Sequence, residues 1–326
     1  MPFLDIKRLT KYYHEEAVFR DVSMRLEKGD ILSLVGPSGT GKSTFLRCLA
    51  GLEQGTSGQI IIEGRDMTNV KAEKRPVVLM FQQPLLFPHM TVLENVTYGL
   101  RIRGIRKKAL HEKGRRMLGK VSLSDYADRY PSECSGGQQQ RIALARALII
   151  KPELLLLDEP FSSLDEQLRR SLRSWVRELL KEENMTSIFV THDREEAVFI
   201  GDRLAIMDGG SLVQIGKTNE VTNAPVSSRV STLAGDGLNL GYGFVPAEDI
   251  QMVTAGNDPG AEFAQIDGVI ERVWHMHGVR FAEVRTRRHS VNIHSPSEVS
   301  EGEQVNLVWK KGACRPFKLE KDDNDA

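Results

Sequence analysis

The sequence contains few of the features that mark a secreted or membrane-spanning protein. Only three cysteines occur in 326 residues, far apart and without a CxxC pair, which argues against a disulfide framework or a structural zinc site. No apolar run approaches the about 18 residues of a membrane span. The nearest, residues 147–157, is broken by Lys151-Pro152-Glu153, and residues 1–8 lack the apolar core of a signal peptide. We therefore expect a protein of the reducing cytosol that does not itself cross a membrane.

An excess of charge of either sign is also missing. Lys and Arg together number 44, equal to Asp and Glu, so the formal net charge is +0. A protein that binds nucleic acid or an anionic membrane mainly through electrostatics usually carries an excess of positive charge. We therefore expect no nucleic-acid partner. Apolar residues make up 40% of the chain, and its length allows two domains with a sizeable core.

Strands alternating with helices are expected over roughly the first two thirds of the chain. Apolar runs predict strands at 31–35, 59–63, 77–81, 154–157, 186–191 and 203–207, and helical patterns are expected at 43–52, 139–150, 168–180 and 194–200. This alternation indicates a mostly parallel sheet with helices on both faces. Residues from about 85 to 150 are mainly helical and charge-rich. We therefore predict an α/β domain over residues 1–235 with a helical subdomain at about 85–150.

Past about residue 234 the helical periodicity disappears. Glycines at 235, 237, 241 and 243 predict a linker, and alternating patterns at 291–294 and, in part, 305–309 predict strands. We therefore expect a small, β-rich domain over residues 236–326. Its acidic end, residues 320–326, is expected to be disordered.

A phosphate-binding loop follows the strand expected at 31–35. The segment fits the pattern G-x-x-x-x-G-K-[ST] and consists of Gly36, Pro37, Ser38, Gly39, Thr40, Gly41, Lys42, Ser43 and Thr44. Its glycines let backbone N–H groups turn toward phosphate oxygens, and the following helix adds partial positive charge. Lys42 is expected to reach the β- and γ-phosphates, and the Ser43 hydroxyl to ligate Mg²⁺. The loop predicts binding of a nucleotide together with Mg²⁺.

An acidic pair stands where a catalytic pair is expected. Asp158-Glu159 comes directly after the strand at 154–157, and the carboxyl ends of strands in an open α/β sheet lie beside the ligand. Asp158 is expected to hold Mg²⁺, and Glu159 to polarise the attacking water. A solvated acidic turn is the alternative, which the phosphate loop in the same chain makes the weaker interpretation.

A second glycine-rich segment, Cys134-Ser135-Gly136-Gly137-Gln138, precedes the helix expected at 139–150. Ser135 and Gly137 at a helix start would form an anion site from free N–H groups and the helix dipole. A nucleotide needs only one such loop at a time. The economical interpretation is that this segment serves a nucleotide held by another subunit.

In type and order these motifs resemble the ATP-binding subunit of an ABC transporter over about residues 3–235, and the second segment is similar to the LSGGQ signature of that family. The resemblance implies an α/β P-loop ATPase fold, with a RecA-like parallel-sheet core and antiparallel β and helical subdomains. It also implies ATP hydrolysis in a head-to-tail homodimer. There the signature residues cap the γ-phosphate held by the partner subunit; these are Ser135, Gly136, Gly137 and Gln138.

The resemblance assigns roles to residues that are unremarkable alone. Gln82 falls where the family has its Q-loop glutamine, which contacts Mg²⁺ and senses the membrane subunits. Ser163-Leu164-Asp165 resembles the D-loop at the dimer interface. His192 matches the switch histidine that contacts the γ-phosphate. With Lys42 and Glu159, Gln82 and His192 form the catalytic set that the resemblance implies.

Two positions need a choice. Tyr13 stands where the family stacks an aromatic ring on adenine, and Tyr12 is the competing candidate; an aromatic face suits either assignment. The signature departs from the family at its first position, where Cys134 replaces leucine. Since cysteine behaves as a small apolar side chain, we expect Cys134 to pack and not to touch phosphate.

The remaining resemblance concerns the branch of the family. Residues 87–96 and 202–216 resemble importer ATPases, and the C-terminal part is similar to the all-β, OB-like regulatory domain of importers for sugars, polyamines, ferric ion, sulfate or molybdate. Its short length favours an inorganic ion, a polyamine or a related small solute. The implied partners are transmembrane permease subunits and, indirectly, an extracytoplasmic solute-binding protein. The implied place is the cytoplasmic face of the inner membrane, as a peripheral protein.

Two alternatives lie outside import. One is an ABC exporter subunit, and the other is a non-transport ABC ATPase that acts on nucleic acid or ribosomes. Chromosome-maintenance members would need a long coiled coil between Lys42 and Asp158, and that interval has no sustained heptads. Translation-factor members carry two cassettes, and this chain has one.

Overall fold

The computed structural model describes residues 1–162, 164–254, 260–276, 279–295 and 299–318. The chain forms two compact units, Met1–Leu212 and Val213–Ala326. Each unit has a buried apolar core of its own.

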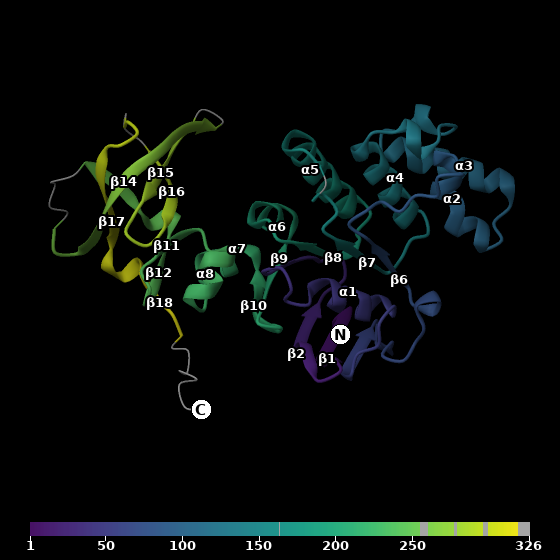
Figure 1. The fold of residues 1–326 in the computed structure, drawn as a ribbon, viewed down its shortest axis with the longest axis horizontal. Helices are drawn as coiled ribbons and strands as arrows, with labels where there is room; N and C mark the ends of the chain where they lie inside the picture. The colour runs from purple at the N-terminus through teal and green to yellow at the C-terminus, as the bar shows by residue number, and fades with distance from the viewer. Residues whose placement is uncertain (163, 255–259, 277–278, 296–298, 319–326) are drawn as a thin grey trace. The chain divides into compact units, whose positions relative to one another are not determined.

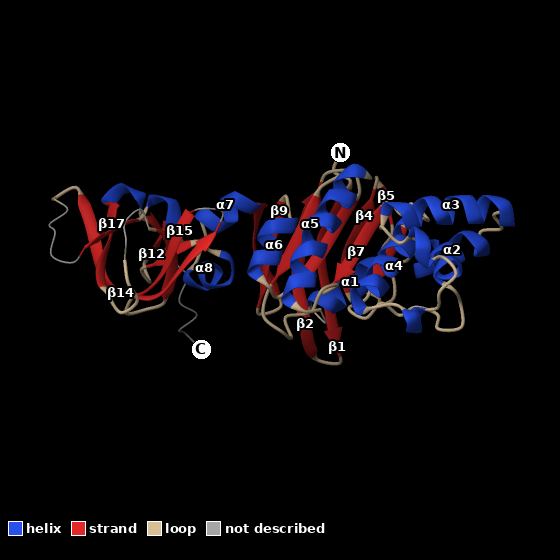
Figure 2. Cartoon of the chain, turned by 90° about the horizontal axis from the view of Figure 1, so that it is seen from above, coloured by secondary structure: helices blue, strands red, loops and turns tan. Residues whose placement is uncertain are grey.

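A parallel sheet forms the centre of the first unit (Figures 1 and 2). Its strands lie in the order β9-β3-β8-β7-β6, and their bounds are Arg203–Asp208, Ile31–Val35, Thr186–Thr191, Leu154–Asp158 and Val77–Met80. Every residue of β3, β7 and β8 is buried, as in strands covered on both faces. The predicted parallel sheet is confirmed, because these neighbouring strands pair in parallel. Strand β10 (Ser211–Lys217) follows β9 in the sheet order and contains the boundary between the units.

An antiparallel sheet forms a second layer of this unit. Its order is β2-β1-β4-β5, with bounds Glu16–Leu26, Leu4–Tyr13, Ser57–Ile62 and Arg65–Asp66. Helix α1 (Lys42–Ala50) lies between this layer and the parallel sheet (Figure 1). Phe45 of α1 meets Phe19 of β2 edge-on, with ring centroids 5.7 Å apart. The helix that follows the phosphate loop is therefore held on both sides.

The remaining helices of the first unit confirm the expected helical stretches. Helices α2 (Val92–Ile102), α3 (Lys107–Lys120) and α4 (Gly136–Leu148) occupy the stretch predicted at about 85–150. Helices α5 (Glu166–Glu182) and α6 (Arg194–Ile200) lie on the side of the parallel sheet away from α1 (Figure 1). Helix α5 buries one apolar stripe, because its leucine and valine positions recur at helical spacing.

The second unit begins with two short helices and continues as β-structure. Helices α7 (Thr218–Asn223) and α8 (Ser228–Ala234) precede a three-stranded sheet, β11-β12-β18, with bounds Gly237–Asn239, Gly243–Pro246 and Arg315–Pro316. A five-stranded antiparallel sheet has the order β13-β17-β14-β15-β16, with bounds Gln251–Thr254, Gln304–Lys310, Phe263–Met276, Val279–Arg285 and Ser290–His294. Its outer strands β13 and β16 also approach each other. This curled sheet agrees with the predicted small OB-like domain.

The boundary between the units differs from the predicted one. Residues 213–235 were assigned to the first domain, yet α7 and α8 group with the β-rich unit. Backbone bonds explain this: Asp236 N donates to Thr222 O, and Lys318 N donates to Val226 O, both at 3.1 Å. Asn239 Nδ2 also donates to Ser231 Oγ at 2.7 Å. The two short helices therefore pack as part of the second unit.

The glycine-rich stretch after residue 234 is not the predicted linker. Strands β11 and β12 pair there in antiparallel register, with Leu238 and Val245 fully buried. A Cβ on Gly237 would lie 2.1 Å from Val245 O, so this glycine permits close strand contact. The acidic end at 320–326 lies outside the described residues. Within the described ranges, no helix has the length and apolar character of a membrane span.

Candidate nucleotide site

The phosphate loop joins the end of β3 to the start of α1. Gly41 is the N-cap of α1 with φ +90°, and a Cβ there would lie 2.8 Å from Val18 O, so only glycine fits without strain. A Cβ on Gly36 would lie 2.0 Å from Met207 O. No side chain caps the start of α1, so its first amides are available to an anion. Lys42 is 6% exposed, and its ammonium donates to Gly36 O and Pro37 O, each at 2.8 Å. Burial lowers the pKa of Lys42. The negative charges of Glu159 and Asp158 oppose this shift.

Asp158 stands at the end of β7, beside the start of α1. Ser43 Oγ donates to Asp158 Oδ1 at 3.0 Å, and the Asp158 carboxyl is 7% exposed. Burial raises the pKa of Asp158, because the charged form loses water, while the Ser43 hydrogen bond opposes the shift. The two oxygen ligands that the sequence predicts for Mg²⁺ are therefore in contact.

Glu159 and His192 meet from neighbouring strands. His192 Nδ1 lies 3.1 Å from Glu159 Oε2, and Nδ1 must carry the proton when the carboxylate is ionised. Glu159 has φ +44°, an uncommon left-handed conformation for a side-chain-bearing residue. Its N–H donates to Val190 O at 3.0 Å. The end of β8 thereby holds both the backbone and the side chain of Glu159.

Gln82 lies beyond β6, on the far side of β7 from β8. Its Nε2 donates to Ser162 Oγ at 2.9 Å, and Ser162 Oγ donates to Glu159 O at 3.0 Å. The predicted Q-loop glutamine is thus linked through one hydroxyl to the backbone of the predicted catalytic glutamate.

Tyr13 has contacts with the segment after α1 and with the end of the phosphate loop. Its hydroxyl donates to Glu53 Oε1 at 2.6 Å, and the Lys11 ammonium lies 4.7 Å from its ring centroid. The Glu53 hydrogen bond raises the pKa of Tyr13, and a bond to Thr44 at the loop's end opposes it. The Tyr12 ring is instead approached by Arg20, at 5.7 Å. The assignment of Tyr13 as the aromatic residue at the adenine stays a prediction.

The signature segment begins α4 in the helical subdomain. Ser135 is the N-cap: its N–H donates to Gln138 Oε1 at 2.9 Å, and its Oγ accepts from Gln138 N at 3.4 Å. A Cβ on Gly137 would lie 2.6 Å from Leu168 Cδ2, so this glycine permits close packing of α4 on α5. The described hydrogen bonds of Ser135 and Gln138 stay within the helical subdomain. They do not reach the phosphate loop of the same chain.

Cys134 packs, as predicted. It is 8% exposed within the main apolar core, and its thiol donates to Tyr130 O at 3.6 Å. Burial raises the pKa of the Cys134 thiol. The cysteine therefore fills the apolar position of the signature.

Of the predicted D-loop, Leu164 and Asp165 are described and Ser163 is not. Asp165 is the N-cap of α5, and its Oδ1 accepts from Leu168 N at 3.0 Å. Its position at the start of α5 is structural within one chain. Its predicted interface role stays a prediction.

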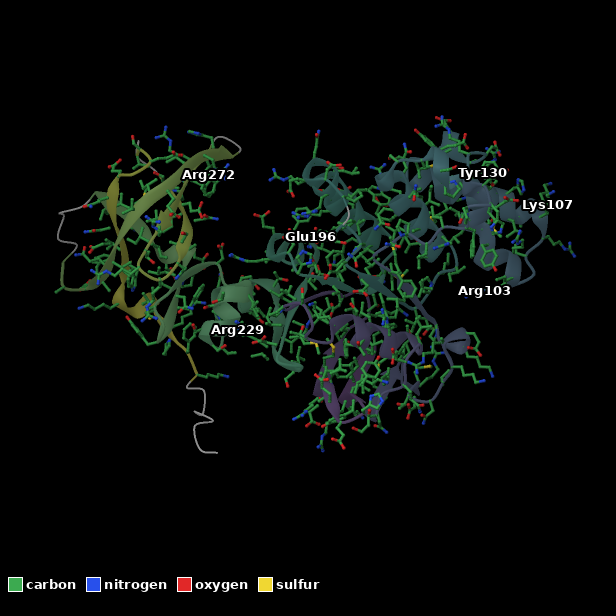
Figure 3. The ribbon with its side chains drawn as sticks, viewed as in Figure 1. Arg103, Lys107, Tyr130, Glu196, Arg229 and Arg272 are labelled. Atoms are coloured by element: carbon green, nitrogen blue, oxygen red, sulfur yellow. The ribbon has the colours of Figure 1, made fainter. Side chains whose placement is uncertain are left out.

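A buried charge network that the sequence analysis missed holds the start of α6. Arg173 on α5 is 6% exposed, and its Nη2 lies 3.0 Å from Asp193 Oδ2 and 3.3 Å from Glu196 Oε1. Thr191 Oγ1 donates to Glu196 Oε2 at 2.6 Å, and Figure 3 shows Glu196 on α6. Asp193 also caps α6 through Glu196 N. Because Thr191 and Asp193 flank His192, the network fixes the backbone of the predicted switch residue. The paired residues lie 20 and 23 positions apart in the sequence, so no local pattern predicts the network.

A phosphate loop after β3, with an acidic pair at the end of β7 hydrogen-bonded to it, in a layered α/β fold, defines a P-loop nucleotide-binding protein. The family model described as ABC transporter matches residues 19–162. The chain is 43% identical over 234 residues to the Fe(3+) ions import ATP-binding protein FbpC 1 of Pectobacterium atrosepticum, covering 72% of this chain and 66% of that protein. It is 41% identical over 268 residues to the sulfate/thiosulfate import ATP-binding protein CysA of Nocardia farcinica, covering 82% and 80%.

The chain belongs to the ABC transporter family, as an ABC-type ATPase subunit. A solved structure agrees: the ATP-binding cassette MJ0796, a dimer in a post-hydrolysis state bound to ADP and Pi, matches with a TM-score of 0.59 and 29% identity. The match covers 66% of this chain and 98% of that one. The family and fold class predicted from the motifs are confirmed.

Proposed function

We propose that the chain hydrolyses ATP in a head-to-tail homodimer and that this hydrolysis drives solute import through partner membrane subunits. The observation that carries the proposal is the convergence of five side chains from two strand ends and one helix start. They are Lys42, Ser43, Asp158, Glu159 and His192.

The residues divide the chemistry among them. Lys42 neutralises charge on the β- and γ-phosphates, and Tyr13 stacks on the adenine. Glu159 takes the proton of the attacking water, which its carboxylate can do from a partly exposed position, while His192 orients that carboxylate through Nδ1. Gln82 is linked to the backbone of Glu159 by hydrogen bonds through Ser162.

The site suits Mg²⁺. Mg²⁺ prefers hard oxygen ligands and is commonly held by one or two protein groups together with phosphates and waters. Ser43 Oγ and Asp158 Oδ1 supply two such oxygens 3.0 Å apart, and the buried Asp158 carboxyl, whose pKa burial raises, gains from a neighbouring cation. When bound, the ion would neutralise phosphate charge; Ser43 and Asp158 would hold it, and Gln82 would contact it.

The composite site needs a second chain. The start of α4 offers a helix dipole and small residues, yet its described hydrogen bonds stay in the helical subdomain. The solved relative is a dimer bound to ADP and Pi. We infer that Ser135, Gly136, Gly137 and Gln138 complete the partner's site, with Asp165 at the interface between the chains.

Import is the direction that the relatives support. Their names are ferric ion and sulfate/thiosulfate import ATP-binding proteins. By this likeness the partners are permease subunits and, through them, an extracytoplasmic solute-binding protein. The chain would then lie peripherally at the cytoplasmic face of the inner membrane. An inorganic ion is the class of solute that these names favour.

Co-purification tests this function. A tagged chain, isolated from detergent-solubilised membranes of its own cells, is expected to bring down integral membrane subunits in fixed stoichiometry, with ATP turnover that depends on Mg²⁺. The measurement is mass spectrometry of the purified complex together with its ATPase rate. Recovery with ribosomes or nucleic acid, and without integral membrane subunits, would favour the non-transport alternative.

Tyr13→Ala is expected to weaken ATP binding about tenfold, since base–aromatic stacking contributes about 1–3 kcal/mol. Tyr12→Ala is the matched control, because Tyr12 neighbours Tyr13 in β1 but contacts Arg20 instead. Its ATP affinity should change less than about twofold. The check is titration of each purified variant with a fluorescent ATP analogue. Equal losses in both variants, or a loss in Tyr12→Ala alone, would reverse the assignment.

A further inference from the structure

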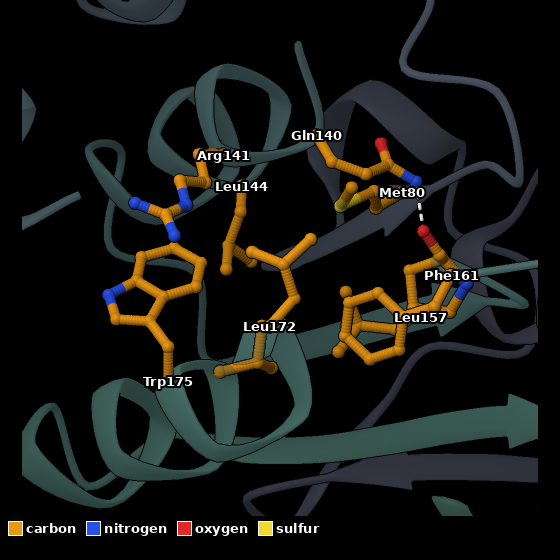
Figure 4. A pocket seen from close by; sticks show the side chains of 10 residues that line it. Met80, Gln140, Arg141, Leu144, Leu157, Phe161, Leu172 and Trp175 are labelled. Atoms are coloured by element: carbon orange, nitrogen blue, oxygen red, sulfur yellow. Dashed lines mark hydrogen bonds between the residues drawn. The ribbon is translucent and has the colours of Figure 1, made fainter. Parts of the chain in front are cut away.

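A buried amide joins the signature helix to the chain's own nucleotide site. Gln140 lies on α4 just after the signature segment, and its side chain is 3% exposed. Its Nε2 donates to Pro160 O and, at 3.4 Å, to Gln82 O. Figure 4 shows the amide pointing from α4 toward the segment that carries Phe161. One side chain on the signature helix thus contacts the residue after Glu159 and the Q-loop.

An amide is an expensive choice at this position. Its surroundings are apolar, with Met80, Leu144, Leu157 and Leu172 lining the same pocket (Figure 4). Gln140 Oε1 is buried and has no hydrogen-bond partner among the described residues. A buried polar atom without a partner is destabilising, so an apolar side chain of equal size would suit packing better. What the amide adds, and an apolar side chain cannot, is the pair of hydrogen bonds that Nε2 donates.

Those bonds hold a backbone that is strained. Glu159 has φ +44°, and such a conformation persists only where its surroundings determine it. Val190 O accepts from its N–H at 3.0 Å, and Ser162 Oγ donates to its carbonyl at 3.0 Å. Gln140 then holds the next carbonyl, that of Pro160. It is the one member of this set that comes from α4.

We propose that Gln140 is a positioning residue that couples the two nucleotide sites of the dimer. This rests on the proposed function, because it requires the signature segment to face the partner's nucleotide. Helix α4 then presents its first turn to one nucleotide while Gln140 ties its second turn to Glu159-Pro160 and Gln82 at the other. Capture of a nucleotide by the signature turn shifts α4, and Gln140 transmits that shift to the backbone that sets Glu159.

The test compares Gln140→Met with Leu144→Met. Methionine matches glutamine in length and lacks the N–H donors, whereas Leu144→Met alters the wall of the same pocket without touching either bond. For each full-length variant, the ATP dependence of turnover gives kcat and the Hill coefficient, and binding of a fluorescent ATP analogue gives the affinity. We expect Gln140→Met to lose about tenfold in kcat and its Hill coefficient to fall to about 1. Its ATP affinity should stay within about twofold of wild type, because Lys42 and Tyr13 are untouched. Leu144→Met should match wild type in all three.

Each possible result either supports the proposal or overturns it. Wild-type kcat and cooperativity in Gln140→Met would overturn the proposal while leaving the composite site intact. A lower kcat with an unchanged Hill coefficient would also overturn it, since Gln140 would then act on one site only. A wild-type protein that neither dimerises with ATP nor shows cooperativity would remove the proposed function, and this coupling with it. Thermal unfolding reports whether Gln140→Met folds; if it does not, Gln140→Asn, which withdraws the amide from both carbonyls, takes its place with the same expected results.

Discussion

Glu159→Gln is expected to lower ATP turnover by about 10²–10⁴-fold, the usual contribution of a positioned general base, while ATP binding persists. Glutamine has the size of glutamate, and its amide oxygen can still accept from His192 Nδ1, which lies 3.1 Å from Oε2. It cannot take a proton from water. Lys42 and Ser43 are unchanged, so nucleotide binds and the closed dimer accumulates. Light scattering during size-exclusion chromatography, with and without Mg²⁺–ATP, measures this dimer, and phosphate release measures turnover.

Glu166→Gln is the matched control for the loss of one carboxylate. Glu166 lies in the first turn of α5, its side chain is 54% exposed, and it pairs with Arg170 at the helix surface. An exposed pair of this kind contributes at most about 1 kcal/mol, so turnover should stay within about twofold of wild type. Wild-type turnover in Glu159→Gln would exclude this residue as the base. A variant that binds ATP and stays monomeric would instead count against the composite site.

Local sequence patterns predicted the parts of this fold that have regular periodicity. Strands β3, β7 and β8 are short apolar runs ended by turn residues, so buried parallel strands were evident. Strand β1 was not predicted, because register shifts after Ile6 interrupt its alternation of buried and exposed residues. The long strand β14 was missed as well. Its pairing with β17 is fixed by a segment about 30 residues or more further along the chain and not by its own pattern.

The glycines at 235–243 show the limit of composition. A run of glycines is typical of a flexible linker, but here Gly237 and Gly243 permit a close approach between backbones, and a Cβ on Gly243 would lie 2.8 Å from Arg315 O. Arg315 is far along the chain, so nothing near the glycines predicts this contact.

The candidate site, like the fold, has parts that local sequence predicts and parts that only tertiary packing determines. The phosphate loop, Asp158-Glu159 and the signature are contiguous motifs, and the chemistry they predict follows from their residue types. Arg173 and Gln140 belong to no motif of this kind. Their burial and their bonds to Asp193, Glu196 and Pro160 come from packing of α5 and α4 on other segments. Tertiary contacts of this kind leave no local pattern in the sequence.

Mixing two chains that cannot close on ATP alone is expected to restore a single intact ATP-binding site, if each site is built from two subunits. The first chain carries Lys42→Ala, which removes the phosphate-loop ammonium. The second carries Gly136→Glu: a Cβ there meets only Leu164 Cδ2, at 3.6 Å, and a carboxylate suits the first turn of α4, so the helix should fold. The same carboxylate repels the γ-phosphate of the partner's nucleotide. Both chains also carry Glu159→Gln, so that a closed dimer persists once formed.

Each chain alone should stay monomeric with Mg²⁺–ATP, for different reasons. In a mixed dimer both lesions fall on one nucleotide site, because the altered phosphate loop of one chain faces the altered signature of the other. The second site is intact. An equal mixture should therefore give dimers in about half of the random pairings, each retaining one ATP, as light scattering and bound-nucleotide analysis would report. Gly136→Ala, which keeps the site uncharged, is the control. This variant should form homodimers without the other chain. If the site were contained in one chain, both lesions would act on their own subunit, and the mixture would stay as monomeric as its parents.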